Sequence, residues 1–359
     1  MKAAEKLGFE ETLLRDVVSK NRCAGCGACV IVCPFNCLEY TQAQTPRLVS
    51  ECQKCGICVK VCPRYEWSLP EMEKFVFGRN RKPEEVFGIY TEMYIAKSTS
   101  KEVLNVCQDG GVATALLVSA LESKLIDGAV LAHTDSERPL LPKPVVAETR
   151  EEIMRGAGTK YSYSPNLLTL KDVIERKKQS VAFVGTPCHI QALRKIQVFP
   201  LRKYSNPIKF MIGLMCTESF EYESFIERFL PQTLGVNLRD VKKMNIKGKI
   251  LIELRSGEVK EISLKEAKQY TRKGCFYCTD FSSEFADISL GGLGLNQQTF
   301  TIIRTEKGSE IFENALKKNF ITAEPVSEES FSFRLLKKLS KMKRKELQRV
   351  CKVVFTSKG

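Results

Sequence analysis

A cysteine motif occurs twice near the N-terminus of this sequence, and it restricts what that part of the chain can fold around. The first copy is CAGCGACVIVCP, residues 23–34, and the second is CQKCGICVKVCP, residues 52–63. Both copies read C-x2-C-x2-C-x3-C-P, the spacing that holds [4Fe–4S] clusters in two-cluster bacterial ferredoxins. The sequence therefore predicts an N-terminal ferredoxin domain with two clusters.

Each cluster is expected to take ligands from both motifs. Three thiolates of one tight loop bind three irons of a cube, and the fourth thiolate comes from the other motif. Zinc is the alternative, but zinc sites are usually built from two CxxC pairs and not from two sets of four. The expected iron ligands are Cys23, Cys26, Cys29 and Cys62 for one cluster and Cys52, Cys55, Cys58 and Cys33 for the other.

The hydropathy of the chain and the charged residues at its start indicate where in the cell it is located. No run of 18 apolar residues is present, so we expect no transmembrane segment. The first residues mix acids and bases and lack the apolar stretch of a secretory signal. The expected location is therefore the cytoplasm, where thiols stay reduced, with attachment to the cytoplasmic face of a membrane as an open alternative.

The net charge indicates an acidic partner. The formal charge is +14. Three oxidised clusters, each about −2 with its thiolates, would leave roughly +8. Such a surface attracts an anionic cofactor, an acidic protein surface, anionic lipid or nucleic acid.

Downstream of residue 90 the pattern changes to alternating strands and helices. Strands are expected at 92–98, 126–133, 180–185 and 208–215, with an apolar helix at 112–125. This alternation is typical of a largely parallel sheet, so the predicted fold class is α+β with an α/β core. The predicted divisions are a two-cluster ferredoxin domain over 1–70, a linker over 71–90, an α/β domain over 91–305 and a basic helical segment over 306–359.

Four further cysteines occupy informative positions in the α/β domain. Cys188 and Cys216 each follow a buried strand and open a helix, at the carboxyl ends where open α/β sheets bind ligands. Cys275 and Cys278 form a CFYC pair. A third [4Fe–4S] cluster, a structural zinc and unconnected buried cysteines are the three interpretations that the residues alone leave open.

Three glycine-bearing segments are candidates for holding an organic cofactor, and plain turns are the alternative for each. Backbone amides at the start of a helix attract phosphate. In a chain that already carries one-electron clusters, these segments favour FAD, because a flavin converts between hydride and single-electron transfer. The α/β domain is therefore expected to bind flavin. The candidate residues are Gln108, Asp109, Gly110, Gly111 and Thr114 in the first segment, Gly158, Thr159, Lys160 and Tyr161 in the second, and Gly291, Gly292 and Gly294 in the third.

The C-terminal segment is strongly basic. From Arg334 to Gly359 it holds ten lysines or arginines and one acid, Glu346. A solvated helix packed on the domain and a docking helix for a protein or membrane surface are both open. The segment lacks interleaved aromatic residues, so no nucleic-acid partner is expected.

Several of these segments resemble the coenzyme F420 hydrogenase/dehydrogenase beta-subunit family. They are QDGGVATALL, GTKYSYSPN, VAFVGTPCHIQAL and CFYCTDFSSEFADISLGGLG, and the resemblance covers nearly all of residues 90–300. It implies bound FAD and hydride exchange with coenzyme F420, a 5-deazaflavin. It also implies a third [4Fe–4S] cluster on Cys188, Cys216, Cys275 and Cys278.

Within this family, the ferredoxin domain in front makes the chain most similar to the electron-input subunit of reduced-F420 dehydrogenases. Those archaeal enzymes feed methanophenazine or a quinone, in the context of methanogenesis. The resemblance implies that reduced F420 passes a hydride to FAD, and that the clusters carry single electrons to a membrane-bound respiratory complex or a ferredoxin-type acceptor. The expected partners are F420 and other subunits of an electron-transfer complex.

Hydride transfer requires no acid–base residue, so no catalytic residue is predicted. Two other functions remain open. One is an iron–sulfur relay subunit without catalysis of its own. The other is a reductase of another substrate, such as sulfite, that takes electrons from F420 or ferredoxin.

Overall fold

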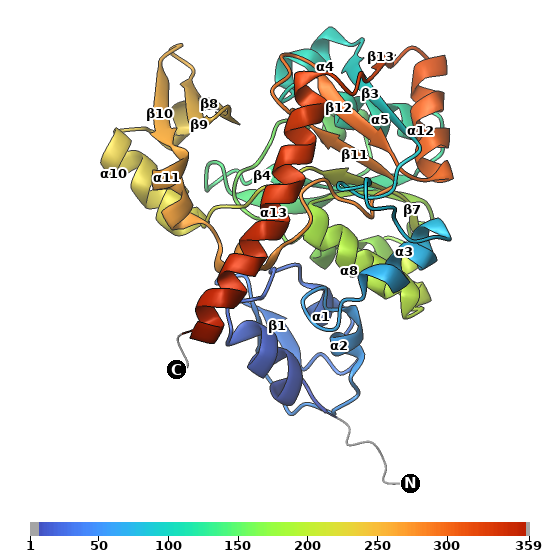
Figure 1. Cartoon of the computed structure of the whole chain (residues 1–359), viewed down its shortest axis with the longest axis vertical. Coiled ribbons are helices and arrows are strands. Elements are labelled where there is room, and N and C mark those ends of the chain that lie inside the picture. The colour runs from blue at the N-terminus through green and yellow to red at the C-terminus, as the bar shows by residue number, and fades with distance from the viewer. Residues whose placement is uncertain (1–6, 357–359) are drawn as a thin grey trace.

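The computed structural model describes residues 7–356, with side chains up to residue 347. A small N-terminal module lies at one end of a large mixed α/β domain, and the long helix α13, Phe331–Thr356, runs from the large domain toward that module (Figure 1). Within the described range, none of the helices combines the length and the apolar run that a membrane span needs.

The N-terminal module is built around the two cysteine loops. Gly27 and Gly56 precede the short helices with left-handed φ values of 80° and 73°, a conformation that glycine adopts without steric penalty. Each loop can therefore turn directly into a helix after its second cysteine. The elements are η1 Glu10–Val18, α1 Ala28–Ile31, the antiparallel strands β1 Leu38–Tyr40 and β2 Pro46–Leu48, and α2 Ile57–Val61.

One eight-stranded sheet forms the centre of the large domain, in the order β13-β3-β12-β11-β7-β6-β4-β5. Its central strands β11, β7, β6 and β4 are parallel, and the remaining neighbours pair antiparallel. Parallel strands covered on both faces are largely apolar, which is why they were readable in the sequence. The bounds are β3 Glu92–Ser98, β4 Gly128–Thr134, β5 Pro142–Ala147, β6 Val181–Gly185, β7 Ile208–Leu214, β11 Ile288–Gly291, β12 Thr299–Ile303 and β13 Ile321–Pro325.

Helices cover both faces of this sheet. Leu116 of α5 and Phe312 of α12 share one apolar core with the sheet, and Leu193 of α8 belongs to the core on the other side. The helices of this domain are α3 Leu69–Phe77, α4 Lys101–Val106, α5 Val112–Glu122, α6 Arg150–Arg155, η2 Asn166–Thr169, α7 Leu170–Glu175, α8 Pro187–Val198, α9 Arg202–Ser205, η6 Lys273–Tyr277 and α12 Glu306–Lys317.

A smaller three-stranded antiparallel sheet lies between β7 and β11 in the sequence and stands to one side of the large sheet (Figure 1). It has a core of its own, which includes Phe225, Ile250 and Ile252. Its elements are η3 Tyr222–Phe229, α10 Leu230–Leu234, η4 Leu238–Asp240, β8 Val241–Ile246, β9 Lys249–Leu254, β10 Val259–Ser263, α11 Leu264–Ala267 and η5 Lys268–Tyr270.

The expected divisions of the chain cut through some of these elements. Helix α3 begins at Leu69, so it crosses the division placed at residue 70 and occupies part of the expected linker 71–90. The expected helical segment 306–359 contains α12 and α13 but also β13, which pairs with β3. β13 is a short edge strand of largely exposed residues, and such strands lack the apolar alternation that identifies a strand in sequence.

Helix α8 holds the ferredoxin module against the sheet. Ile31 and Val61 of the module belong to the same core as Leu193 of α8. The Lys195 ammonium donates to the carbonyls of Cys62, Tyr65 and Glu66 at 2.9, 2.6 and 3.3 Å. These carbonyls follow the end of α2, where backbone acceptors have no partner within the helix.

We predict that Lys195→Met lowers the free energy of unfolding by about 1–3 kcal/mol, because three carbonyls lose a charged donor. Thermal unfolding of the anaerobically reconstituted chain measures the effect. Lys171→Met, an exposed position on α7, is the matched control and should stay within about 0.5 kcal/mol of the parent. Equal losses in both variants would contradict the docking role of Lys195.

Candidate functional site

The eight motif cysteines surround two separate small cavities in the N-terminal module. Each cavity brings together the members of one expected ligand set, including the cysteine that comes from the other motif. Cys55 is exposed, whereas Cys26 and Cys29 are buried, so the second set lies nearer the surface. The first cavity is lined by Cys23, Cys26, Cys29 and Cys62, and the second by Cys33, Cys52, Cys55 and Cys58.

Four of the five cysteines of the α/β domain, all but Cys107, also come together. β6 and β7 are adjacent parallel strands, so Cys188 and Cys216, which follow them, lie at the same edge of the sheet. Cys275 belongs to η6, and Cys278 follows it directly. Burial raises the pKa of Cys216 well above its ordinary value, and the nearby thiols of the other three raise it further. We name Cys188, Cys216, Cys275 and Cys278 the third cysteine set.

Positively charged side chains surround the third cysteine set. Lys343 of α13 is buried, and its ammonium donates to the carbonyls of Thr217 and Cys275. Burial disfavours its charge, but the thiols of Cys278, Cys275 and Cys216 outweigh this effect and raise the pKa of Lys343. The donor environment is therefore suited to an anionic group.

The pKa of Arg64, a residue of the ferredoxin module, is subject to the same two opposing effects as that of Lys343. Burial opposes its charge, and the thiols of Cys278 and Cys188 raise its pKa above the usual value. Its buried Nε has no hydrogen-bond partner in the described part of the chain. A buried donor without a partner carries a free-energy penalty unless an anion is close by.

The third cysteine set fits a cluster by the chemistry of its donors. Among the side chains that the structure describes, those of residues 7–347, no group of three or more His, Cys, Asp or Glu is placed to hold a single metal ion. A [4Fe–4S] cube distributes its four thiolates over four irons, so its ligands need not converge on one point. The third cysteine set supplies the four thiols that such a cube needs, and the adjacent cations suit its negative charge.

A cavity of about 420 Å³, which we name the inner cavity, lies at the carboxyl ends of β6, β7 and β11. Cys216 of the third cysteine set lines it, and so do Gly111 and Val112 at the start of α5. Gly111 has a φ of 72°, and no side chain caps the helix. The first amides of α5 are therefore available to a phosphate group.

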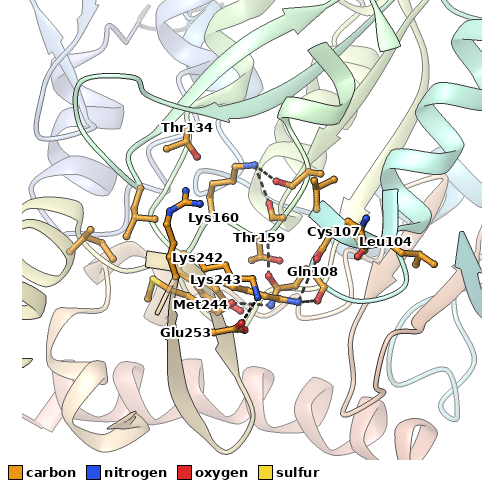
Figure 2. A pocket seen from close by; sticks show the side chains of 18 residues that line it. Leu104, Cys107, Gln108, Thr134, Thr159, Lys160, Lys242, Lys243, Met244 and Glu253 are labelled. Atoms are coloured by element: carbon orange, nitrogen blue, oxygen red, sulfur yellow. Dashed lines mark hydrogen bonds and ion pairs between the residues drawn. The ribbon is translucent and has the colours of Figure 1, made fainter. Parts of the chain in front are cut away.

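A second cavity of about 690 Å³, the outer cavity, adjoins the inner one. Figure 2 shows it between the loop around Thr159, the segment of Cys107 and Gln108, and the strands that carry Lys242 and Glu253. Four cations and a single acid line this cavity, so its potential is positive. They are Lys160, Lys242, Lys243, Arg255 and Glu253.

Gln108 forms part of the wall that the two cavities share. Its amide nitrogen donates to the Met244 carbonyl at 2.9 Å, and its amide oxygen accepts from the Thr159 backbone N–H at 3.4 Å. Lys243 donates to the carbonyls of Cys107 and Gln108. These contacts connect the first glycine segment, which contains Gln108, to the loop around Thr159 and to strand β8.

Lys160 has a structural role in addition to lining both cavities. Its ammonium donates to the carbonyls of Gly156, Ala157 and Gly158 at 2.6, 2.9 and 3.0 Å. Figure 2 shows the bonds to Ala157 and Gly158. Burial lowers the pKa of Lys160 to about 8. The ammonium therefore holds its own loop in shape.

The structure gathers the three glycine segments around the inner cavity, and eleven of the twelve candidate residues line it. Gly110 does not, because it packs against backbone, where a Cβ would lie 2.7 Å from both Ala96 O and Thr299 N. The lining candidates are Gln108, Asp109, Gly111, Thr114, Gly158, Thr159, Lys160, Tyr161, Gly291, Gly292 and Gly294.

Other residues around these cavities were not identified from the sequence. Lys242, Lys243 and Arg255 belong to strands β8 and β9 or the turn after them, where alternating charged residues look like an ordinary solvated face. Thr186 and His189 flank Cys188 in the GTPCH segment, and that proximity to a candidate ligand was the available signal. Burial lowers the pKa of His189 to about 3.

Comparison with known proteins gives matches over most of the chain. The family described as coenzyme F420 hydrogenase/dehydrogenase, beta subunit, matches with its N-terminal part at residues 93–171 and its C-terminal part at residues 178–329. A 4Fe–4S dicluster domain matches residues 15–63.

Three similar proteins illustrate these matches. The beta subunit of the coenzyme F420 hydrogenase of Methanosarcina barkeri is 40% identical over 264 residues, covering 71% of this chain and 89% of the relative. A subunit of the F420H2 dehydrogenase of Methanosarcina mazei is 31% identical over 350 residues, covering 94% and 95%. A chain in the structure of the F420-reducing [NiFe] hydrogenase complex of Methanosarcina barkeri has a TM-score of 0.71 at 36% identity, covering 75% and 94%.

We predict that Cys216→Ala lowers the iron content of the reconstituted chain from about twelve to about eight irons, because one cluster loses a ligand. Iron and zinc quantification with EPR spectroscopy measures this. Cys37→Ala is the control, since Cys37 is a buried thiol that donates to the Glu51 carbonyl. An unchanged iron content, or stoichiometric zinc lost in place of iron, would contradict the assignment.

Proposed function

Because the chain belongs to the coenzyme F420 hydrogenase/dehydrogenase beta-subunit family, we propose that it oxidises reduced coenzyme F420 by hydride transfer to FAD and passes single electrons through [4Fe–4S] clusters to an outside acceptor. One observation carries this proposal: the inner cavity shares wall residues with a basic cavity and is also lined by Cys216 of the third cysteine set. Substrate, cofactor and first cluster would thus be arranged in series.

We assign FAD to the inner cavity. When bound, FAD supplies the conversion between a two-electron hydride and single electrons. The free amides at the start of α5, next to Gly111, are placed to bind its pyrophosphate. Leu117, Leu131 and Leu290 line the same cavity and would exclude water from the flavin ring.

We assign the anionic tail of F420 to the outer cavity. F420 carries a phosphodiester and a glutamate tail, and the lysines and arginine of this cavity outnumber its acid by four to one. Gln108, Thr159 and Tyr161 line both cavities, so a ring entering from the outer cavity would meet the inner one beside them. These residues would orient the substrate and do not exchange protons with it.

Electrons leaving the inner cavity would next reach the third cysteine set and then the ferredoxin module. Burial raises the pKa values of Cys23 and Cys26, and Cys188 contributes to both, which supports close approach of the third and first sets. The second set includes the exposed Cys55. We propose this exposed side as the exit to the acceptor.

The acceptor is proposed to be another subunit of an electron-transfer complex. Two of the similar proteins are named as subunits of a hydrogenase and of an F420H2 dehydrogenase. By this analogy the chain would dock on a larger assembly, including one held at the cytoplasmic face of a membrane.

The proposal is tested by mixing the anaerobically reconstituted chain with FAD, reduced F420 and a viologen dye, and following the deazaflavin absorbance. The expected result is turnover that disappears when FAD is omitted. Clusters without any turnover would instead identify a relay protein. Turnover that requires sulfite or another oxidised substrate would identify a reductase.

We predict that Arg255→Gln and Lys242→Gln each raise the KM for reduced F420 about two- to fivefold with little change in kcat, because each removes an exposed charge worth up to about 1 kcal/mol. The same steady-state assay measures the KM. Added salt should also raise the KM of the parent chain, because it screens the attraction between the cavity and the anionic tail of F420. Lys249→Gln, on the same β-hairpin but paired with Glu261 outside the cavity, should leave KM unchanged. Equal effects at all three positions would contradict the outer-cavity assignment.

A further inference from the structure

Tyr163 lies where the inner cavity, the third cysteine set and the ferredoxin module meet. The residue is 3% exposed and lines the inner cavity. Its hydroxyl oxygen is 2.9 Å from His189 Nε2 and 3.5 Å from Cys188 Sγ. Its backbone carbonyl accepts from Gln44 Nε2 at 3.1 Å, so the ferredoxin module holds it from the other side.

The position of the Tyr163 ring is fixed by a further contact across the same junction. The Arg272 guanidinium carbon lies 4.3 Å from the centre of the ring, within the range of a cation–π interaction. Arg272 also donates to the carbonyls of Ala24 and Gln44 in the ferredoxin module. The ring therefore has little freedom to move its hydroxyl away from Cys188.

The surrounding hydrogen bonds also determine where the hydroxyl proton points. The Thr186 backbone N–H donates to His189 Nδ1 at 3.2 Å, which makes Nδ1 an acceptor. A neutral imidazole with Nδ1 as acceptor carries its proton on Nε2. A protonated Nε2 cannot accept a hydrogen bond from the Tyr163 hydroxyl 2.9 Å away, so the Tyr163 proton is left for the sulfur of Cys188.

A second hydroxyl is close to the same sulfur but lacks this directionality. Thr186 Oγ1 lies 3.2 Å from Cys188 Sγ and 3.1 Å from His189 Nδ1, so its proton has two acceptors. Tyr163 is thus the hydroxyl whose direction the neighbouring groups define.

We propose that Tyr163 is a positioning residue that donates a directed hydrogen bond to Cys188 and thereby raises the reduction potential of the third cluster. This inference rests on the proposed function, because it needs a cluster on the third cysteine set. Hydrogen bonds to ligand sulfurs tune cluster potentials, since they stabilise the more negative reduced state. A higher potential favours electron acceptance from the inner cavity.

The test is an EPR-monitored redox titration of the full-length reconstituted chain. Tyr163→Phe removes only the hydroxyl, and the expected result is a more negative third-cluster potential, by about tenfold in the one-electron equilibrium constant or about 59 mV. The potentials of the two ferredoxin clusters should not move. Tyr222→Phe is the matched control, because it also loses one hydroxyl, which donates to the Pro139 carbonyl.

His189→Asn tests the directional part of the inference. Asparagine places its side-chain oxygen roughly where histidine has Nδ1, so the acceptor for the Thr186 N–H remains while the Nε2–H is lost. We expect a smaller shift in the same direction, and no further shift when this change is added to Tyr163→Phe, because the two residues act through one hydrogen bond.

The outcomes separate this inference from the proposed function. A third EPR signal that is present but unmoved by Tyr163→Phe overturns the role of Tyr163 alone. A parent chain with about eight irons and no third signal overturns the proposed function and this role together. If Tyr163→Phe fails to assemble the third cluster, an unshifted potential in His189→Asn overturns the inference, and a negative shift supports it.

Discussion

The placement of positive charge around the third cysteine set is the constraint on which the rest of the structure depends. Charge that leaves water is stable only when it is paired and hydrogen-bonded. Arg64 follows the second cysteine motif, Arg272 precedes the CFYC pair, and Lys343 belongs to α13. Three segments far apart in the sequence are therefore held at one place. One of these segments is the basic C-terminal helix α13, whose Lys343 is buried beside the third cysteine set.

A second group of charges holds the surrounding segments in position. Glu284, whose side chain is 4% exposed, pairs with Arg81 of the segment between the two domains and with Arg344 of α13, each at 2.5 Å. Phe333 and Leu336 of α13 are buried against Phe281 and its neighbours. The helix is thus packed on the large domain through its apolar face, while Lys337, Lys338 and Lys341 stay outside the core.

The sequence predicted best what depends on local spacing or on apolar runs. The family resemblance is confirmed by the matches over residues 93–329, and the dicluster ferredoxin domain by the match over 15–63. The buried parallel strands were visible because both of their faces are apolar. The edge strand β13 was not, because an exposed edge strand has the composition of a loop.

The roles of individual side chains were harder to predict from the sequence, because they depend on contacts between segments that are far apart along the chain. Lys160 lines both cavities, and its place at a cofactor stays a prediction, but the sequence did not show that its ammonium also binds three carbonyls of its own loop. Gly110 was expected there too, and instead it lets two backbone segments approach. Whether the remaining candidates contact FAD stays a prediction. The proposed hydrogen bond from Tyr163 to Cys188 could not be predicted from the sequence, because its direction depends on the tautomer of His189, which the Thr186 backbone N–H selects.

The proposed function requires that this one chain convert a hydride into single electrons on its ferredoxin clusters. Rapid anaerobic mixing of the FAD-loaded chain with reduced F420, followed by freeze-quench EPR, tests it without any partner or dye. We expect the third-cluster signal to appear first and the ferredoxin signals to follow, and neither to appear in the FAD-free chain. Ferredoxin signals that rise without FAD, or clusters that stay oxidised in the loaded chain, would contradict it.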